Sequence, residues 1–136
     1  MGVIMNEYEK QAQDFLNSTE TELTVEFIGY KKYFPDDKET RSVFKFTLCR
    51  AGKSYNGTFG QSIAERDKTP SAYDILSCLD YWEGDFGDFC AEYGYSDDSI
   101  NARNTYNAVI KQSNGLKELF TFDELEKLGE IAWSNI

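Results

Sequence analysis

Two stretches of alternating apolar and polar residues most constrain the fold of this chain. Residues 21–30 and 41–51 both place apolar side chains at every second position. This period of two is typical of strands that bury one face. The turn-forming residues between and after the two stretches, among them Gly52, favour antiparallel pairing. The sequence therefore predicts an antiparallel meander whose third strand runs through Tyr55 and Phe59.

A three-stranded sheet with one apolar face needs helices packed on that face. Apolar residues at helical spacing predict helices at about 6–17, from Thr69-Pro70 to Gly84, from Asp85 to Gly94 and from Ser99 onward. The helix that begins at Ser99 should have a kink or an end near Ser113-Asn114-Gly115. A capping box of Thr121 and Glu124 predicts the start of a last helix. A chain of 136 residues has the usual length of one domain. We therefore expect a single α+β domain over residues 1–136: an N-terminal helix, a three-stranded antiparallel meander and a C-terminal helical half packed on the sheet. Its core should contain most strand and helix phenylalanines, including Phe27, Phe46 and Phe89.

The stretch from Thr69 to Ala102 carries most of the charge of the chain. It contains eight Asp and Glu residues and no Lys or Arg, so it holds −8 of the formal net charge of −10. Seven Tyr, Trp and Phe residues are interleaved with these acids. A segment so rich in aromatic residues is expected to fold, unlike an acidic tail.

The residue types narrow the possible chemistry. The chain has no histidine, which removes the commonest general acid and base and the commonest metal ligand. Cys49, Cys78 and Cys90 match no zinc or redox spacing, and each is expected to be a small buried apolar residue. No glycine-rich phosphate loop is present, and Asp80 to Asp88 does not follow the ligand order of an EF-hand. We therefore expect no enzymatic activity, no metal and no cofactor.

The sequence also bears on location and on nucleic acids. No apolar run reaches the length of a membrane helix, and the first residues lack the pattern of a secretory signal, so we expect a cytoplasmic protein without membrane contact. The acidic balance and the lack of a basic patch argue against direct nucleic-acid binding.

The runs Thr69–Leu79 and Asp88–Tyr95, together with Asp98-Ser99, resemble a group of small acidic proteins encoded by bacteriophages and prophages. The resemblance covers roughly Thr69 to Ser99 and consists of core and cap residues. It implies a setting, the cytosol of a bacterial host, where phage accessory proteins often bind and inhibit restriction, CRISPR or other host machinery. The oligomeric state stays open.

Three interpretations of the acidic stretch remain: a solvated face, a metal site, or a face that binds a basic surface of a host protein. The third includes mimicry of nucleic acid in an inhibitor of a defence system. The expected contacts are seven carboxylates with two tyrosines as candidate anchors: Asp80, Glu83, Asp85, Asp88, Glu92, Asp97, Asp98, Tyr81 and Tyr95. The alternatives are a small-molecule-binding or hydrolytic protein with a site between sheet and helices, and an acidic structural protein without an inhibitory role.

Overall fold

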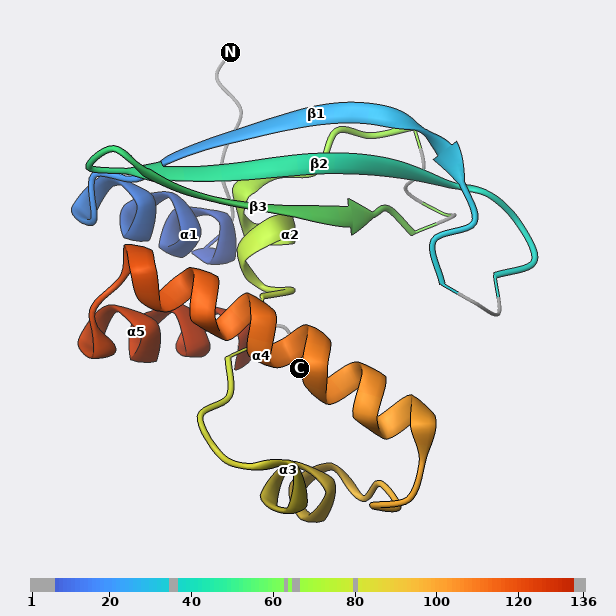
Figure 1. Cartoon of the computed structure of the whole chain (residues 1–136). Helices are drawn as coiled ribbons and strands as arrows, with labels where there is room; N and C mark the ends of the chain where they lie inside the picture. Colours follow the sequence, from blue (N-terminus) through green and yellow to red (C-terminus); the bar gives the residue numbers. More distant parts are fainter. Residues whose placement is uncertain (1–6, 35–36, 63, 65–66, 80, 134–136) are drawn as a thin grey trace.

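In the part of the chain that the structure describes, helix α1 (Glu7–Ser18) precedes a three-stranded sheet, and four further helices follow the sheet (Figure 1). The computed structural model describes residues 7–34, 37–62, 64, 67–79 and 81–133. The elements after α1 are β1 (Glu22–Lys31), β2 (Arg41–Arg50), β3 (Lys53–Gly60), α2 (Ala72–Leu76), α3 (Phe86–Tyr93), α4 (Ile100–Leu119) and α5 (Phe122–Trp133). This order confirms the predicted α+β class and the predicted sequence of helix, meander and helical half.

The sheet is an antiparallel meander in the order β1-β2-β3. In its register Leu23 lies opposite Leu48, which in turn lies opposite Tyr55, so apolar side chains of all three strands share one face. Strands β2 and β3 are joined by a tight turn at Ala51 and Gly52, both with positive φ. The alternation seen in the sequence thus sets which face of the sheet is apolar.

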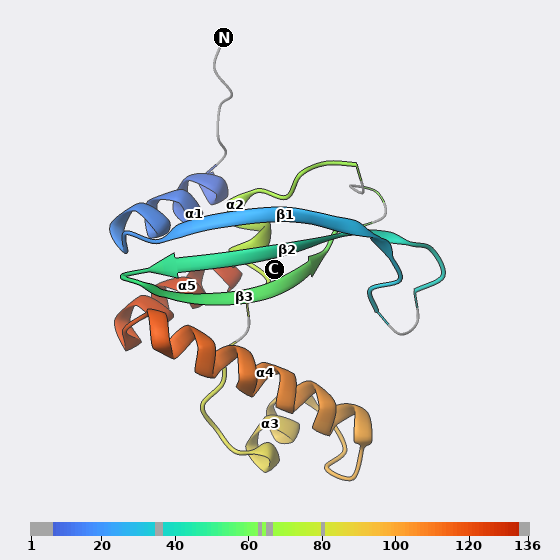
Figure 2. The ribbon, with the colours of Figure 1, turned by 45° about the horizontal axis from the view of Figure 1, so that its top comes forward.

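All labelled helices lie on one side of the sheet (Figures 1 and 2). The core forms between this side and the helices, because the apolar face of the sheet and the apolar stripes of the helices have no other cover. Its buried members are Ala12, Phe15, Leu16, Phe46, Leu48, Ile75, Leu76, Leu79, Leu116, Leu119, Phe120, Leu125, Leu128 and Ile131.

An ion pair joins the end of β2 to the start of α5. The Arg50 guanidinium donates to the two carboxylate oxygens of Glu124 at 2.6 and 2.9 Å, and to the Leu119 carbonyl at 2.8 Å. Glu124 also accepts a hydrogen bond from the Thr121 amide and completes the predicted capping box. The hydrogen bonds from Arg50 hold the pKa of the Glu124 carboxyl below its usual value, although partial burial opposes them. The pair fixes the C-terminal helix to the sheet.

The predicted bounds of two helices were wrong. Helix α2 starts at Ala72, because Ser71 is extended and forms a capping box with Asp74, and it ends at Leu76. The apolar spacing that predicted a helix up to Gly84 continues in a loop, where Leu79 is still buried. Helix α4 runs without interruption through Ser113. The two weak helix formers in this region, Ser113 and Gly115, lie against Trp82 and Tyr55, and these contacts favour a continuous helix.

Two expected core residues lie at the surface. The Phe27 side chain is 48% exposed, because a bulge between Phe27 and Gly29 interrupts the register at the end of β1. Its ring packs instead on Phe44 and Tyr30, with centroids 5.4 and 5.1 Å away. Cys78 is exposed and Cys49 is half-buried, so only Cys90 is buried as expected.

In the described part of the chain, no helix combines the length and the apolar character that crossing a bilayer requires.

Candidate functional site

Most of the acidic stretch forms a lobe that packs on α4. This α3 lobe, residues 81–99, consists of a loop, helix α3 and a second turn, and it occupies the lower end of the molecule in Figure 1. Asp85 caps the helix by accepting a hydrogen bond from the Asp88 amide at 2.8 Å, and Gly94 ends it in the left-handed conformation with φ of 73°. The sequence predicted a helix from Asp85 to Gly94, and a short polar side chain and a glycine suit the two cap positions.

Three contacts hold the first loop of the lobe against α4. The Trp82 amide donates to the Ser113 hydroxyl at 2.8 Å, and this hydroxyl donates to the Val109 carbonyl at 2.8 Å. The Tyr106 hydroxyl donates to the Gly84 carbonyl at 3.3 Å. Ser113 therefore joins the first loop of the lobe to α4 without interrupting the helix.

The third contact is an ion pair beside Tyr81. Lys117 Nζ lies 3.3 Å from Glu83 Oε1 and 5.8 Å from the centroid of the Tyr81 ring. Burial raises the pKa of the Tyr81 hydroxyl to about 12, with a further contribution from the hydrogen bond and the charge of Glu83. The hydrogen bonds from Tyr81 and Lys117 lower the pKa of Glu83. Glu83 is therefore engaged within the chain.

Aromatic rings form the interior of the lobe. Phe89 is buried, and its ring centroid lies 5.7 Å from that of Trp82, 4.9 Å from that of Tyr93 and 5.8 Å from that of Tyr95. Tyr93 and Tyr95 remain 58% and 43% exposed. Such large exposed rings on a rigid support are typical of residues that anchor binding partners.

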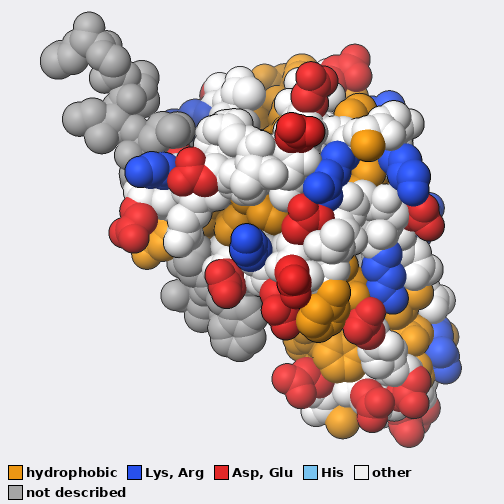
Figure 3. All heavy atoms as spheres, turned by 90° about the vertical axis from the view of Figure 1, so that its left-hand side faces the viewer, with side chains coloured by type: hydrophobic (Ala, Val, Ile, Leu, Met, Phe, Trp, Pro, Cys, Tyr) orange, Lys and Arg blue, Asp and Glu red, His pale blue; other side chains and the backbone are white. Residues whose placement is uncertain are grey.

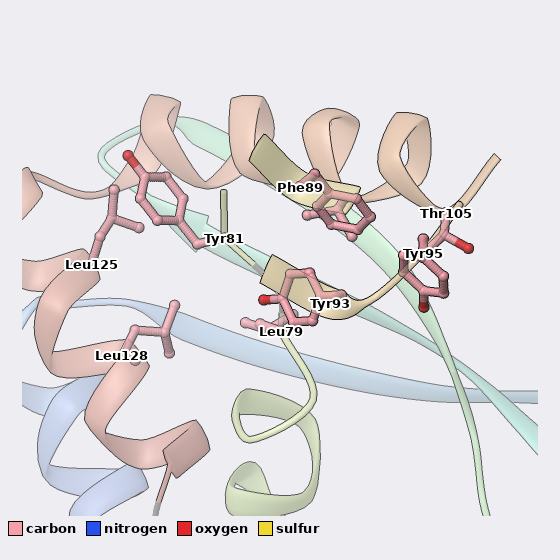
Figure 4. A pocket seen from close by; sticks show the side chains of 10 residues that line it. Leu79, Tyr81, Phe89, Tyr93, Tyr95, Thr105, Leu125 and Leu128 are labelled. Carbon is pink, nitrogen blue, oxygen red and sulfur yellow. The ribbon is translucent and has the colours of Figure 1, made fainter. Parts of the chain in front are cut away.

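The two exposed tyrosines border a cleft of about 350 Å³ between the lobe and helices α4 and α5. Figure 4 shows Tyr93 between Leu125 and Leu128 of α5 on one side and Phe89 and Tyr95 on the other. The complete lining consists of Leu79, Tyr81, Phe89, Tyr93, Tyr95, Thr105, Val109, Leu125, Leu128 and Gly129. No charged side chain is among these lining residues.

The structure describes six of the seven predicted carboxylates, and all six are exposed on the lobe. They are Glu83, Asp85, Asp88, Glu92, Asp97 and Asp98, while Asp80 lies outside the described residues. At the lower end of the molecule, Figure 3 shows carboxylates around an apolar surface.

The six carboxylates differ in what they contact. Asp85 caps α3, Glu83 pairs with Lys117, and Asp98 accepts a hydrogen bond from Ser96. Within the described part of the chain, the side chains of Asp88, Glu92 and Asp97 have neither an ion pair nor a hydrogen bond; these are called the unpaired acids below.

Tertiary structure brings cations closer to the acids than the sequence indicated. Besides Lys117, Arg103 of α4 lies with its guanidinium 3.7 Å from the centroid of the Phe86 ring. Lys117 and Arg103 therefore partly neutralise the negative charge of the lobe on the side that faces α4. The unpaired acids carry the charge that stays available to a partner.

The cleft was not predicted, because α4 and α5 contribute half of its lining from distant positions. One signal was present in the sequence: Gly129 interrupts an otherwise apolar helical stripe. Glycine in a helix interior often has a packing or functional reason.

The rival site between sheet and helices has weak support. A groove does run between α1 and β1, lined by residues that include Gln13, Thr21 and Glu22. Only Glu22 among the lining residues carries a carboxyl group, so the pair needed for acid–base hydrolysis is missing there. Among the described residues, no three Cys, Asp or Glu side chains come together as metal ligands.

Comparisons of this chain with protein-family models, with curated proteins and with solved structures find no match. The choice of a binding surface therefore rests on the geometry of the lobe and the cleft.

Proposed function

We propose that this protein is a non-enzymatic acidic binding protein whose α3 lobe docks on a basic surface of another protein. The observation that carries the proposal is the set of exposed carboxylates on one lobe beside an open aromatic cleft. Its resemblance to phage-encoded acidic proteins supports a partner in the host cytosol. A nucleic-acid-processing enzyme of a defence system, inhibited through its basic groove, fits this chemistry best.

The unpaired acids explain why the lobe would attract such a surface. Carboxylates without an internal cation keep their full field toward solvent, and a basic groove supplies the opposite field. The attraction between exposed charges weakens as salt rises, because the screening length shortens. Exposed tyrosines beside the acids add the apolar contact that stable interfaces need.

Charge reversal at two unpaired acids tests the proposal. The double variant Glu92→Lys, Asp97→Lys should lose capture of its partner from a bacterial lysate at about 50 mM salt, whereas wild type should release the partner only at about 500 mM. The matched control is Asp14→Lys, Glu22→Lys, which makes the same charge change at exposed positions on α1 and β1. The control should capture as wild type does.

Mass spectrometry of the captured proteins and competition by double-stranded DNA complete the test. If the partner is bound as a nucleic-acid mimic would bind it, DNA should displace it. Equal capture by the charge-reversed variant and wild type would contradict the proposed role of the lobe. A partner that DNA does not displace would contradict the mimicry alone.

A further inference from the structure

The cleft beside the lobe is open at Gly129, a position of α5 where a larger residue would have a higher helix propensity. Gly129 lies inside α5 and lines the cleft, and a Cβ atom added there would meet no atom within 4 Å. Glycine is the least favourable residue in a helix interior apart from proline. Any larger side chain at this position would project into space that the fold leaves empty.

The lining selects the kind of group that can enter this space. Its polar side-chain atoms are the hydroxyls of Thr105 and the tyrosines, and the rest of the lining is apolar. A charged head placed there would lose its hydration without gaining a counter-ion, which is costly. The occupant should therefore be an uncharged, apolar side chain.

The charges around the cleft indicate which residues of the partner should flank its apolar side chain. Glu92 directly precedes Tyr93 in the chain and Asp97 follows Tyr95 by two residues, and both acids are exposed. Both acids and both tyrosines are exposed on the same lobe, so a segment whose apolar anchor binds between the tyrosines runs over an acidic surface. Lysine or arginine at those neighbouring positions would complement the charge.

We propose that the cleft binds one apolar side chain of a partner segment that carries Lys or Arg on both sides of this anchor. The inference rests on the proposed function and adds the chemistry that the partner must present. The cleft volume of about 350 Å³ lies at the small end of ligand sites, which suits a side chain better than a whole cofactor. The carboxylates attract the segment, and the cleft fixes its position.

Two blocked peptides test the inference with the full chain labelled for NMR titration. Lys-Lys-Leu-Lys-Lys should bind about tenfold tighter than Lys-Lys-Ala-Lys-Lys, because the leucine buries apolar surface that alanine lacks. In Gly129→Phe the added ring fills the cleft, so the two peptides should bind equally. In the Glu92→Lys, Asp97→Lys variant both peptides should weaken, and the preference for leucine should persist.

These outcomes separate the two proposals. Equal binding of both peptides to wild type, or a leucine preference that survives in Gly129→Phe, would overturn the role of the cleft while leaving the role of the acids intact. Unchanged binding to the charge-reversed variant would instead count against the proposed function. If Gly129→Phe does not fold, Gly129→Leu serves in its place. On wild type, nuclear Overhauser contacts must join the peptide leucine to the rings of Tyr93 and Tyr95.

Discussion

Replacing Gly115 by alanine should destabilise this protein, although the same replacement stabilises most helix interiors. Gly115 lies in α4 where the helix packs against Tyr55 of β3. A Cβ atom at this position would lie 2.2 Å from Cδ1, 2.6 Å from Cε1 and 3.2 Å from Cγ of the Tyr55 ring. Rotation of the ring moves Cδ1 and Cε1 but leaves Cγ in place, so the whole side chain must shift.

The size of the effect follows from two opposing terms. Alanine favours a helix over glycine by about 1 kcal/mol. Overpacking a tightly filled contact costs about 1–3 kcal/mol. Tyr55 has little room to retreat, since its ring packs against Phe46 with centroids 6.1 Å apart. The free energy of unfolding should therefore fall by up to about 2 kcal/mol in Gly115→Ala.

Urea unfolding followed by circular dichroism measures this change, with Gly129→Ala as the matched control. At Gly129 the added Cβ meets nothing, so only the helix term remains and stability should rise by about 1 kcal/mol. In a Tyr55→Leu background the ring is absent, and Gly115→Ala should become stabilising as well. The reasoning is refuted if the two glycine replacements shift stability in the same direction by similar amounts in the wild-type background.

Two further predictions concern the contacts that fix the helices in place. Glu124→Gln should lower stability at neutral pH by about 2 kcal/mol, because the Arg50 hydrogen bonds lose a charged acceptor. Since the pKa of Glu124 is lowered in the folded state, its contribution is complete above the usual value of 4.5 and is lost as pH falls through the lowered value. Urea unfolding should therefore find the variant and wild type converging in acid; a pH-independent gap would contradict the assignment. Ser113→Ala removes the acceptor of the Trp82 amide, so hydrogen exchange at this amide should accelerate and stability should fall by about 1–2 kcal/mol. Unchanged protection of the amide would show that the loop is held by other contacts.

The sequence predicted correctly the strands and helix ends that depend on residues close together in the chain. The alternation in β1 and β2 predicted a meander, because side chains on opposite faces of a strand meet different surroundings. Capping residues predicted both ends of α3 and the start of α5, because a cap satisfies backbone groups only a few residues away.

The errors fall where a distant residue decides the outcome. Ser113 and Gly115 indicated a kink in α4, but Trp82 and Tyr55 contact them and the helix continues. Phe27 had the spacing of a core residue, yet the bulge beside it and the ring of Phe44 determine where it lies. No window of the sequence contains both members of these pairs.

For the candidate site, the sequence by itself determined that acids and aromatic residues alternate within one short stretch and that most of them must fold together. Their charge and spacing are properties of consecutive residues, so the six predicted carboxylates that the structure describes lie with Tyr95 at the surface of one lobe. Only the tertiary structure decided which acids pair with Lys117 and which stay unpaired. It also decided that α5 completes the cleft with Leu125, Leu128 and Gly129, because a cavity exists only between elements and depends on how the whole chain packs.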